Sequence, residues 1–287
     1  MIGFGIATLV IIMMYFVLSL KAGKRYNRFV EQFGTDFQLN FMAPVSLYLI
    51  DYFQIMERMY GQISFIQKRM ISIHGHRQAL MYTKMYLAQL ISTVLVCLLG
   101  STLVALLANG DLTLFIAGMV FTIMIPFVLV QKLSNEEKER KDQILTELPE
   151  VVNKIILLVN AGETVQRALV HCVSSTKDKN SPLYKELRDT VNKLTSNEPF
   201  HQVMNDLSKK VGIQEVSIFT TTILLNYRKG GQDLILALRE LSQDLWEKRK
   251  NISKTKGEEA SSKLVFPLIL IFIAVMIIVG YPAITIL

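Results

Sequence analysis

The sequence has few of the residues that build disulfides, metal sites or catalytic centres. Of its 287 residues only two are cysteine, Cys97 and Cys172, and only four are histidine. Cys97 lies in an apolar segment and Cys172 in a polar one, so the first would lie in lipid and the second in water, and no disulfide is expected. The one close histidine pair, His74 and His76, has no neighbouring Cys, Asp or Glu, whereas structural zinc needs four converging ligands. We therefore expect no metal site and no cofactor.

Charge is also missing from four long stretches of the chain. Only 19% of the residues are Asp, Glu, Lys or Arg, whereas 51% are hydrophobic, and the mean hydropathy is +0.35. The uncharged segments are residues 2–20, 87–108, 112–130 and 264–287. A helix needs about 20 apolar residues to cross the hydrocarbon core of a bilayer, where it must pair its own backbone groups. The sequence therefore predicts four transmembrane helices.

Two polar regions, residues 21–86 and 131–263, remain between these segments. The longer region is large enough to bury a core of its own, whereas the shorter one would be marginal without lipid or a partner to pack against. The second and third uncharged segments are separated only by the polar turn 109–111, which includes a glycine. Such a turn suits an abrupt reversal of the chain, so these two segments are expected to form a transmembrane hairpin.

The distribution of positive charge predicts the topology. Residues 21–86 contain 9 Lys and Arg and residues 131–263 contain 22, which together are all 31 in the chain. If four spans alternate, both regions lie on one side, and an excess of positive charge identifies that side as the cytoplasm. We expect a multi-pass protein of the inner (cytoplasmic) membrane with both chain ends outside. This topology and anionic inner-leaflet lipid account for the net charge of +7 without a nucleic-acid partner.

Two further absences concern activity. The predicted spans contain no charged residue, although proton relays, ion paths and voltage sensors depend on such groups, which disfavours a transporter or channel. The glycine pair Gly230 and Gly231 is not a phosphate-binding loop, because that loop needs a Lys and a Ser or Thr directly after its last glycine. The sequence shows no cluster of nucleophiles, acids or metal ligands near an interface. We therefore expect a protein that is not an enzyme.

The larger polar region, residues 131–263, is predicted to be an all-helical domain of six helices. Its apolar residues recur at three- and four-residue steps, and no run alternates with a period of two. Polar N-caps, first-turn prolines and C-terminal glycines mark where such helices begin and end. The expected markers are Gly162 after the first helix, Thr164 and Ser181 as caps of the second and third, and Pro199 at the start of the fourth. The fifth helix is expected over about residues 214–227.

The sixth helix is expected to begin near Asp233 and to lead into the last span. Leu234, Leu238, Leu241 and Leu245 share one face of it, which would pack inward. Its charged residues crowd the other faces, either as an ordinary solvated surface or as a surface that binds a protein partner. The candidate partner-binding residues are Arg228, Lys229, Gly230, Gly231, Arg239, Glu240 and Asp244.

The shorter polar region, residues 21–86, is rich in aromatic residues and methionine. Pro44 is expected to start a helix there. Methionine-rich surfaces can bind partners, but so much apolar area favours packing on the inner leaflet or on the larger domain. We expect a cytoplasmic helical segment that is not independent of its surroundings.

A series of short strings in the second half of the chain carries a family resemblance. In order, they are Leu148-Pro149-Glu150, Asn160 to Thr164, Ser181 to Leu187, Tyr227 to Gly231, and Leu238 to Leu241, before a charged helix that enters a proline-bearing span. Their order and spacing resemble the type II secretion system protein F family, in particular the single-domain platform proteins of tight-adherence pilus systems. The resemblance covers about residues 148–285, and the order of hairpin, helical domain and final span is similar as well.

The resemblance implies a function and a set of partners. It implies a non-enzymatic inner-membrane platform beneath a growing type IV pilus or type II pseudopilus, with no catalytic residues. The implied partners are a hexameric cytoplasmic ATPase, pilin subunits and the lipid bilayer. Some members of the family have two copies of the helical domain, and residues 21–86 show no convincing second copy, so pairing with a sister platform subunit or a further copy of the chain is expected. The alternative is a membrane-anchored signalling or scaffold protein whose helical domain binds a regulator.

Overall fold

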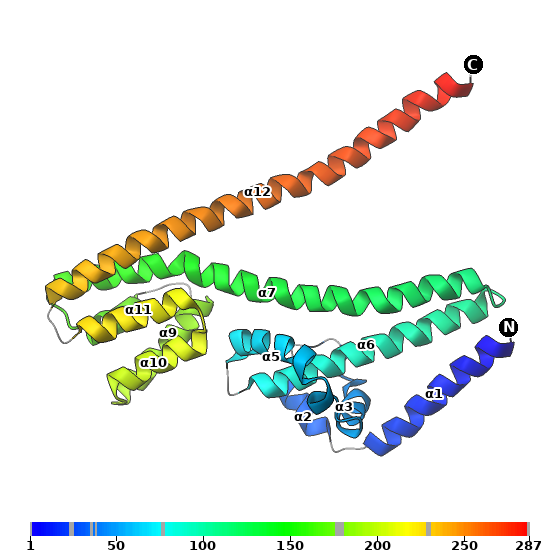
Figure 1. The fold of residues 1–287 in the computed structure, drawn as a ribbon, viewed down its shortest axis with the longest axis horizontal. Coiled ribbons are helices and arrows are strands. Elements are labelled where there is room, and N and C mark those ends of the chain that lie inside the picture. Colours follow the sequence, from blue (N-terminus) through cyan, green and yellow to red (C-terminus); the bar gives the residue numbers. More distant parts are fainter. Residues whose placement is uncertain are drawn as a thin grey trace. The chain divides into compact units, whose positions relative to one another are not determined.

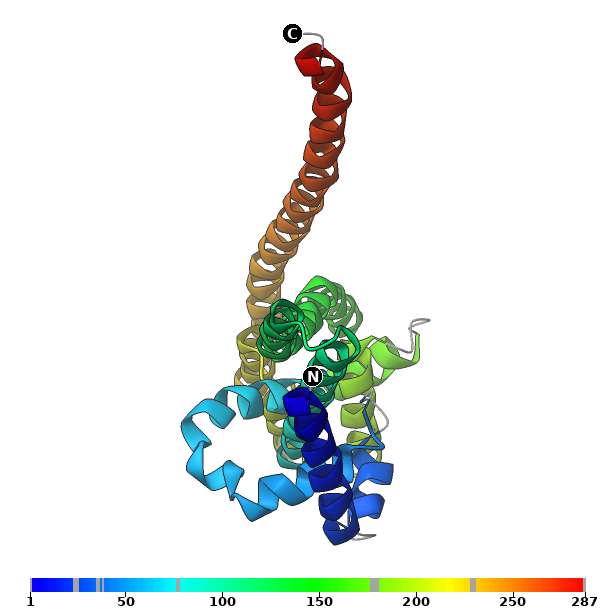
Figure 2. The ribbon, with the colours of Figure 1, turned by 90° about the vertical axis from the view of Figure 1, so that its right-hand side faces the viewer.

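The computed structural model describes residues 2–22, 26–34, 37, 39–75, 78–175, 181–227 and 231–285. Within these residues, every element of regular secondary structure is a helix. Figures 1 and 2 show the path of the chain. The helices are α1 (Ile2–Ala22), α2 (Asn27–Phe33), α3 (Ala43–Tyr52), α4 (Ile55–Arg58), α5 (Tyr60–His74), α6 (Ala79–Leu107), α7 (Leu112–Asn160), α8 (Val165–Ser174), α9 (Pro182–Thr195), α10 (Phe200–Val211), α11 (Gln214–Asn226) and α12 (Gly231–Thr285).

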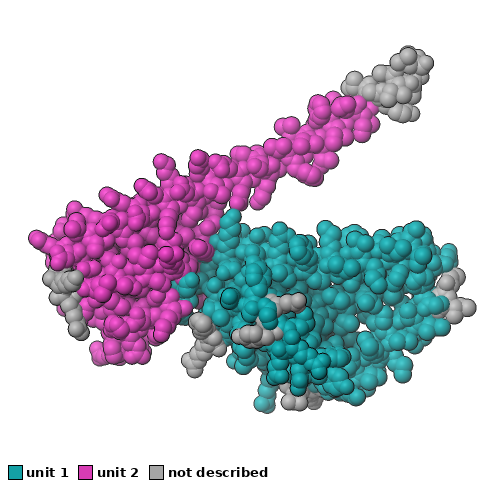
Figure 3. Space-filling view, in the orientation of Figure 1, with its two compact units in different colours: residues 1–140, 210–212 teal, residues 141–209, 213–287 magenta. Residues whose placement is uncertain are grey.

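The helices form two compact units, which Figure 3 colours separately. Unit 1 comprises Met1–Arg140 with Lys210–Gly212, and unit 2 comprises Lys141–Lys209 with Ile213–Leu287. Unit 1 therefore contains α1–α6 and the first part of α7. Unit 2 contains the rest of α7, helices α8, α9 and α11, all of α12, and α10 up to Lys209.

Four of the helices, α1, α6, α7 and α12, are long and apolar enough to cross a membrane. Their most apolar windows are hardly covered by the rest of the protein: 6% of the window is buried in α1 and in α7, 22% in α6 and none in α12. So much exposed Leu, Ile, Val and Phe is unfavourable in water and favourable in lipid. The all-α membrane architecture with four spanning helices, expected from the sequence, is confirmed.

Two of these helices continue well beyond the segments in which charge is absent. The helix α7 begins at Leu112 and runs for 49 residues, far past the end of its uncharged segment at Val130. The helix α12 begins at Gly231, long before its uncharged segment starts at residue 264, and runs for 55 residues. It continues through Gly257 without a break. The polar stretches of both helices are rich in Lys, Glu, Gln and Arg, which favour helix as strongly as apolar residues do. The first and sixth helices of the expected six-helix domain are thus extensions of two spans.

The core of unit 2 lies among α7–α12. Its largest fully buried side chains include Ile155 of α7, Leu169 of α8, Leu187 of α9, Met204 of α10 and Phe219 of α11. Each lies on the apolar face that three- and four-residue spacing predicts for its helix. The domain therefore buries a core of its own, as the length of the region suggested.

The ends of the short helices in unit 2 follow the sequence, with one difference. Thr164 caps α8, because its hydroxyl accepts a hydrogen bond of 3.3 Å from the backbone N–H of Arg167. Ser181 also precedes its helix in an extended conformation, with Pro182 in the first turn, but its side chain makes no cap hydrogen bond. The hydroxyl of Ser181 instead donates to the carboxylate of Glu147 in α7. The expected local cap at Ser181 is therefore replaced by a contact between two helices.

Unit 1 is built around α6. Helix α3, which begins at Ala43 with Pro44 in its first turn as expected, packs against both α6 and α1. The core of this unit includes Leu47 and Ile50 of α3, Met70 of α5, and Met85 of α6. The short polar region thus gains its core by packing on a span.

The inward face of α12 provides a direct test of this packing. Leu238 is fully buried, whereas Leu236, two residues earlier, is 71% exposed. Replacing Leu238 by Ala should lower the free energy of unfolding of the domain by about 2–5 kcal/mol, because it leaves a cavity as well as removing apolar contact. Denaturant unfolding in detergent, followed by the fluorescence of Trp246, the one tryptophan of the chain, measures this difference. Leu236→Ala is the matched control, and an equal loss in the two variants would contradict the packing.

Candidate partner-binding surface

The N-terminal part of α12 has the buried seam that the sequence predicts. Leu234, Leu238, Leu241 and Leu245 are all buried. Because these residues recur at steps of four, three and four, they form one stripe that faces the rest of unit 2. The charged residues of this part of α12 therefore lie on faces that the core does not use.

Three side-chain contacts hold this part of α12 against its neighbours. The hydroxyl of Ser242 donates to Oδ1 of Asn153 in α7 at 2.7 Å. Arg249 donates to Oε1 of Glu150, also in α7, at 2.9 Å. The position of α12 in the domain is thus set by directional polar contacts as well as by its apolar seam.

The third contact is the ion pair of Lys248 with Glu215 of α11, in which Nζ lies 2.7 Å from Oε1. Glu215 is only 8% exposed. Burial by itself raises the pKa of this carboxyl group. The hydrogen bond from Lys248, a backbone hydrogen bond and the positive charges of Lys248 and Lys141 together outweigh it, so that the pKa lies below its ordinary value. The carboxylate is therefore charged at neutral pH and links α11 to α12.

A groove of about 470 Å³ lies between α11 and α12, which pack side by side in unit 2 (Figure 1). Its α11 side carries Ile218, Thr221 and Leu225, which are exposed. Its α12 side carries Glu240 and Asp244. The other lining residues are Gln214, Ser217, Thr222, Asn226, Ala237 and Leu241.

The groove combines an apolar wall with an acidic wall. Ile218 and Leu225 are 42% and 64% exposed, respectively, and stand seven residues apart on one face of α11. None of the described lining residues is basic, and within the described part of the chain neither Glu240 nor Asp244 has an ion-pair partner. An amphipathic helix with basic side chains along one edge has the shape and charge to fit such a groove.

The acidic wall extends along α12 beyond the groove. Asp233, Glu240, Asp244 and Glu247 recur at steps of seven, four and three and are all exposed, so they lie on one face of the helix. Four like charges on one face raise the local affinity for a positively charged partner and its rate of association.

Only some of the candidate partner-binding residues that the sequence suggested line the groove. Glu240 and Asp244 line the groove, whereas Arg239 is exposed but is not part of the lining. Gly231 is the first residue of α12. Arg228, Lys229 and Gly230 lie outside the described residues.

Sequence reasoning did not identify the α11 side of the groove. The relevant signal is that α11 carries more apolar residues than one buried face can hold: Val216, Phe219 and Ile223 fill the core, while Ile218 and Leu225 face outward. A helix of a soluble domain that is apolar on two faces usually has a second neighbour.

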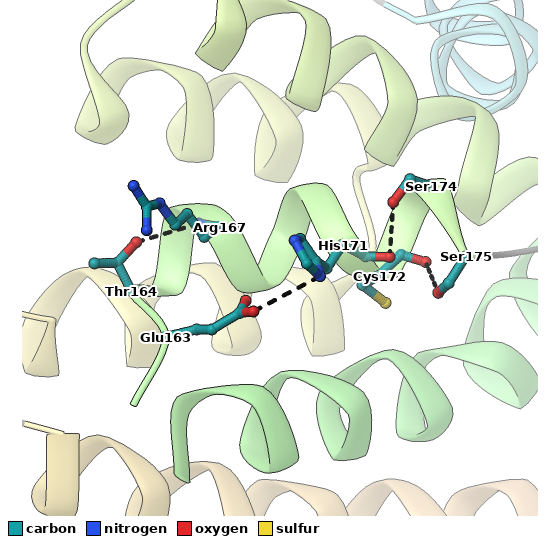
Figure 4. A network of polar contacts seen from close by, with 7 residues as sticks. All are labelled: Glu163, Thr164, Arg167, His171, Cys172, Ser174 and Ser175. Atoms are coloured by element: carbon teal, nitrogen blue, oxygen red, sulfur yellow. Dashed lines mark hydrogen bonds and ion pairs between the residues drawn. The ribbon is translucent and has the colours of Figure 1, made fainter. Parts of the chain in front are cut away.

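The residues of the string Asn160 to Thr164 have structural roles in the turn before α8 (Figure 4). Gly162 adopts a φ of +93°, a left-handed conformation that suits glycine and ends α7. Glu163 lies 3.7 Å from Nδ1 of His171, and Thr164 caps α8. Burial raises the pKa of the Cys172 thiol, which makes this group a poor nucleophile.

The possible metal ligands do not come together in the described part of the chain. Within it, no group of three or more His, Cys, Asp or Glu residues is placed to hold a metal ion. His76 and the side chain of His74 lie outside that part.

Comparison with known families agrees with this arrangement. Residues 151–282 match the family described as Type II secretion system (T2SS), protein F. Residues 151–282 form a domain of the type II secretion system protein F family. The match extends from within α7 to within the last span, so the family domain includes α8–α11, the groove, and nearly all of α12. Neither the curated proteins nor the solved structures gave a match to the chain.

The ion pair of Glu215 with Lys248 predicts how the stability of the domain depends on pH. Because the pKa of Glu215 is lowered by folding, its contribution is complete above the pKa of the unfolded chain, about 4.3, and is lost as the pH falls through the lower folded value. Glu215→Gln should therefore destabilise the domain by about 1 kcal/mol at pH 7 and have progressively less effect in acid.

Unfolding by denaturant at a series of pH values, followed by the fluorescence of Trp246, measures this dependence. Glu240→Gln is the control, because Glu240 is exposed and has no ion-pair partner among the described residues. A Glu215→Gln effect that does not change with pH would contradict the assignment.

Proposed function

We propose that the chain is the non-enzymatic platform protein of a pilus or secretion machine in the inner membrane, and that it couples a cytoplasmic ATPase to the insertion of pilin subunits. The observation that carries the proposal is α12. Its first part is fixed in the family domain by a buried leucine seam and by Lys248 and Arg249, and its last part is a membrane span. A continuous α-helix is stiff along its axis, so movement of the domain has a direct route to the bilayer.

The proposed topology places residues 21–86 and 131–263 in the cytoplasm and the turn 109–111 outside. Its support is that every Lys and Arg of the chain lies in the first two ranges, where the positive-inside rule expects them. With this topology the family domain can meet a cytoplasmic ATPase, while the four spans are available to membrane-stored pilins.

The proposed contact for the cytoplasmic partner is the groove between α11 and α12 with the acidic wall of α12. Its support is the exposed Ile218 and Leu225 beside Glu240 and Asp244. In this proposal the apolar wall gives affinity and the acidic wall selects a partner with basic residues.

The tight-adherence branch is the proposed setting. Its support is the order of a transmembrane hairpin, one helical domain and a final span, which resembles the single-domain platform proteins of those systems. In this setting the protein pairs with a sister platform subunit or with a second copy of itself. The alternative function, a membrane-anchored scaffold whose domain binds a regulator, would use the same groove.

Charge reversal in the groove tests the proposed contact. Glu240→Lys combined with Asp244→Lys should reduce co-purification with a secretion ATPase of the same machine, and should reduce pilus assembly, because it places basic residues where a basic partner binds. The domain should remain folded, since both side chains are exposed. Arg239→Glu, outside the groove, should have a smaller effect.

Glu198→Lys is the matched control, because Glu198 is an exposed carboxylate of the same domain in the turn before α10. Unchanged co-purification and assembly in the double variant, at normal protein levels, would eliminate the groove as the contact. Binding of a regulator in place of an ATPase would favour the scaffold function.

Cysteine labelling tests the proposed topology. In a variant in which Cys97 and Cys172 are replaced, Asp111→Cys should react with a membrane-impermeant maleimide in intact cells. Gln202→Cys, on the exposed face of α10, should react only after the cells are permeabilised. The opposite pattern would show that the family domain is outside the cytoplasm.

A further inference from the structure

The chain between α1 and α6 exposes a set of large apolar side chains that its own core does not use. Helices α3–α5 bury Leu47, Ile50 and Met70 against α6 and one another. The same helices and the turns beside them leave other aromatic and methionine side chains uncovered. These are Phe41 (74% exposed), Tyr52 (70%), Phe53 (51%), Phe65 (51%) and Met59 (46%).

Contacts with α6 place α3 beside one end of a span, which the proposed topology puts at the cytoplasmic face. The hydroxyls of Ser46 and Ser92 are hydrogen-bonded at 2.7 Å, and Ser92 lies inside the uncharged segment 87–108. At the other end of α3, Asp51 pairs with Lys84, which comes three residues before that segment, at 2.6 Å. Helix α3 therefore lies at the depth where α6 passes from hydrocarbon to water.

Contacts with α7 place α5 at a similar level. Arg69 donates to the backbone carbonyl of Val130 at 3.3 Å, and Val130 is the last residue of the uncharged segment 112–130. The guanidinium of Arg69 also lies 3.4 Å from the carboxylate of Glu137, in the polar part of α7. Arg69 thus marks the end of the third span, and its guanidinium lies over the ring of Phe65 at 3.8 Å.

We propose that α3–α5 lie in the cytoplasmic headgroup region of the bilayer, with Phe41, Tyr52, Phe53, Met59 and Phe65 entering the inner leaflet. This segment would then lie in the membrane interface beside α1 and α6. Aromatic side chains favour this level of the membrane, and Lys and Arg can reach the headgroups from it. Figure 2 shows the segment, in light blue, extending to one side of α1.

The lipid bilayer is the partner that best accounts for these exposed side chains, because they are continuous with the apolar surface of two spans. The spans that flank the segment, α1 and α6, expose most of their apolar windows, so lipid already borders this part of unit 1. Residues 21–86 also carry 9 basic and 4 acidic residues, and the exposed Arg58 and Lys68 lie on α4 and α5. This charge suits the anionic inner leaflet. The proposal depends on membrane insertion and not on the role of the protein in a pilus.

The single tryptophan makes the proposal testable in the full-length protein. Trp246 lies in unit 2, so a Trp246→Phe background can receive one new tryptophan at Tyr52 or at Phe65. Each variant is reconstituted in vesicles of phosphatidylcholine and phosphatidylglycerol whose acyl chains carry bromine either close to the headgroups or close to the bilayer centre. Bromine quenches tryptophan on contact and thus reports its depth.

The expected result is that both new tryptophans are quenched more strongly by the shallow bromine than by the deep one. Trp246 in the natural sequence is the control for a residue in water. Phe121→Trp in the same background, on the exposed face of the α7 span, is the control for a residue in lipid. Two independent positions keep the test valid if one substitution disturbs the fold.

Two results would overturn the proposal. Tryptophans at positions 52 and 65 that escape both bromines but are quenched by dissolved iodide, like Trp246, would show that the segment faces water. Tryptophans shielded from bromine and from iodide would show that protein covers it, such as the larger domain, a second copy or a partner.

Discussion

The structure depends on one constraint: a backbone that crosses hydrocarbon must satisfy its hydrogen bonds within the same helix. Four uncharged segments meet this constraint as α1, α6, α7 and α12. A helix that is already formed adds each further residue at little cost, so α7 and α12 continue into water until a glycine or a turn ends them. The two longest helices of the protein arise in this way and serve as the first and last helices of the helical domain.

The family domain is therefore built onto its own membrane anchors. Between α7 and α12 the short helices α8–α11 complete a core, and directional contacts such as Lys248 with Glu215 and Arg249 with Glu150 fix the first part of α12 within it. The surfaces left over are of two kinds. The groove between α11 and α12 combines apolar and acidic walls, which suits a protein partner, whereas the aromatic residues of α3–α5 border the spans, which suits lipid.

Much of this could be predicted from local patterns. The four spans, the leucine seam of α12, the cap at Thr164 and the turn at Gly162 each depend on residues that are close in sequence. No helix ends at Val130 or Lys263, where the uncharged segments meet charged residues, because polarity changes there while helix propensity does not. At Ser181 a local rule predicted a cap, but the hydroxyl bonds to Glu147, because a carboxylate from another helix lies within reach.

The sequence by itself determined the membrane class, the number of spans, the helical content and the family, because apolar length, charge distribution and periodicity are properties of contiguous residues. Only the tertiary structure decided which exposed residues act together. Glu240 and Asp244 join Ile218 and Leu225 in one groove, while Arg239, adjacent in sequence, does not line it. Ser46 is hydrogen-bonded to Ser92, 46 residues away in the sequence, and this contact helps to set the position of α3 along α6. Such groupings depend on the packing of one helix against another, which no short stretch of sequence encodes.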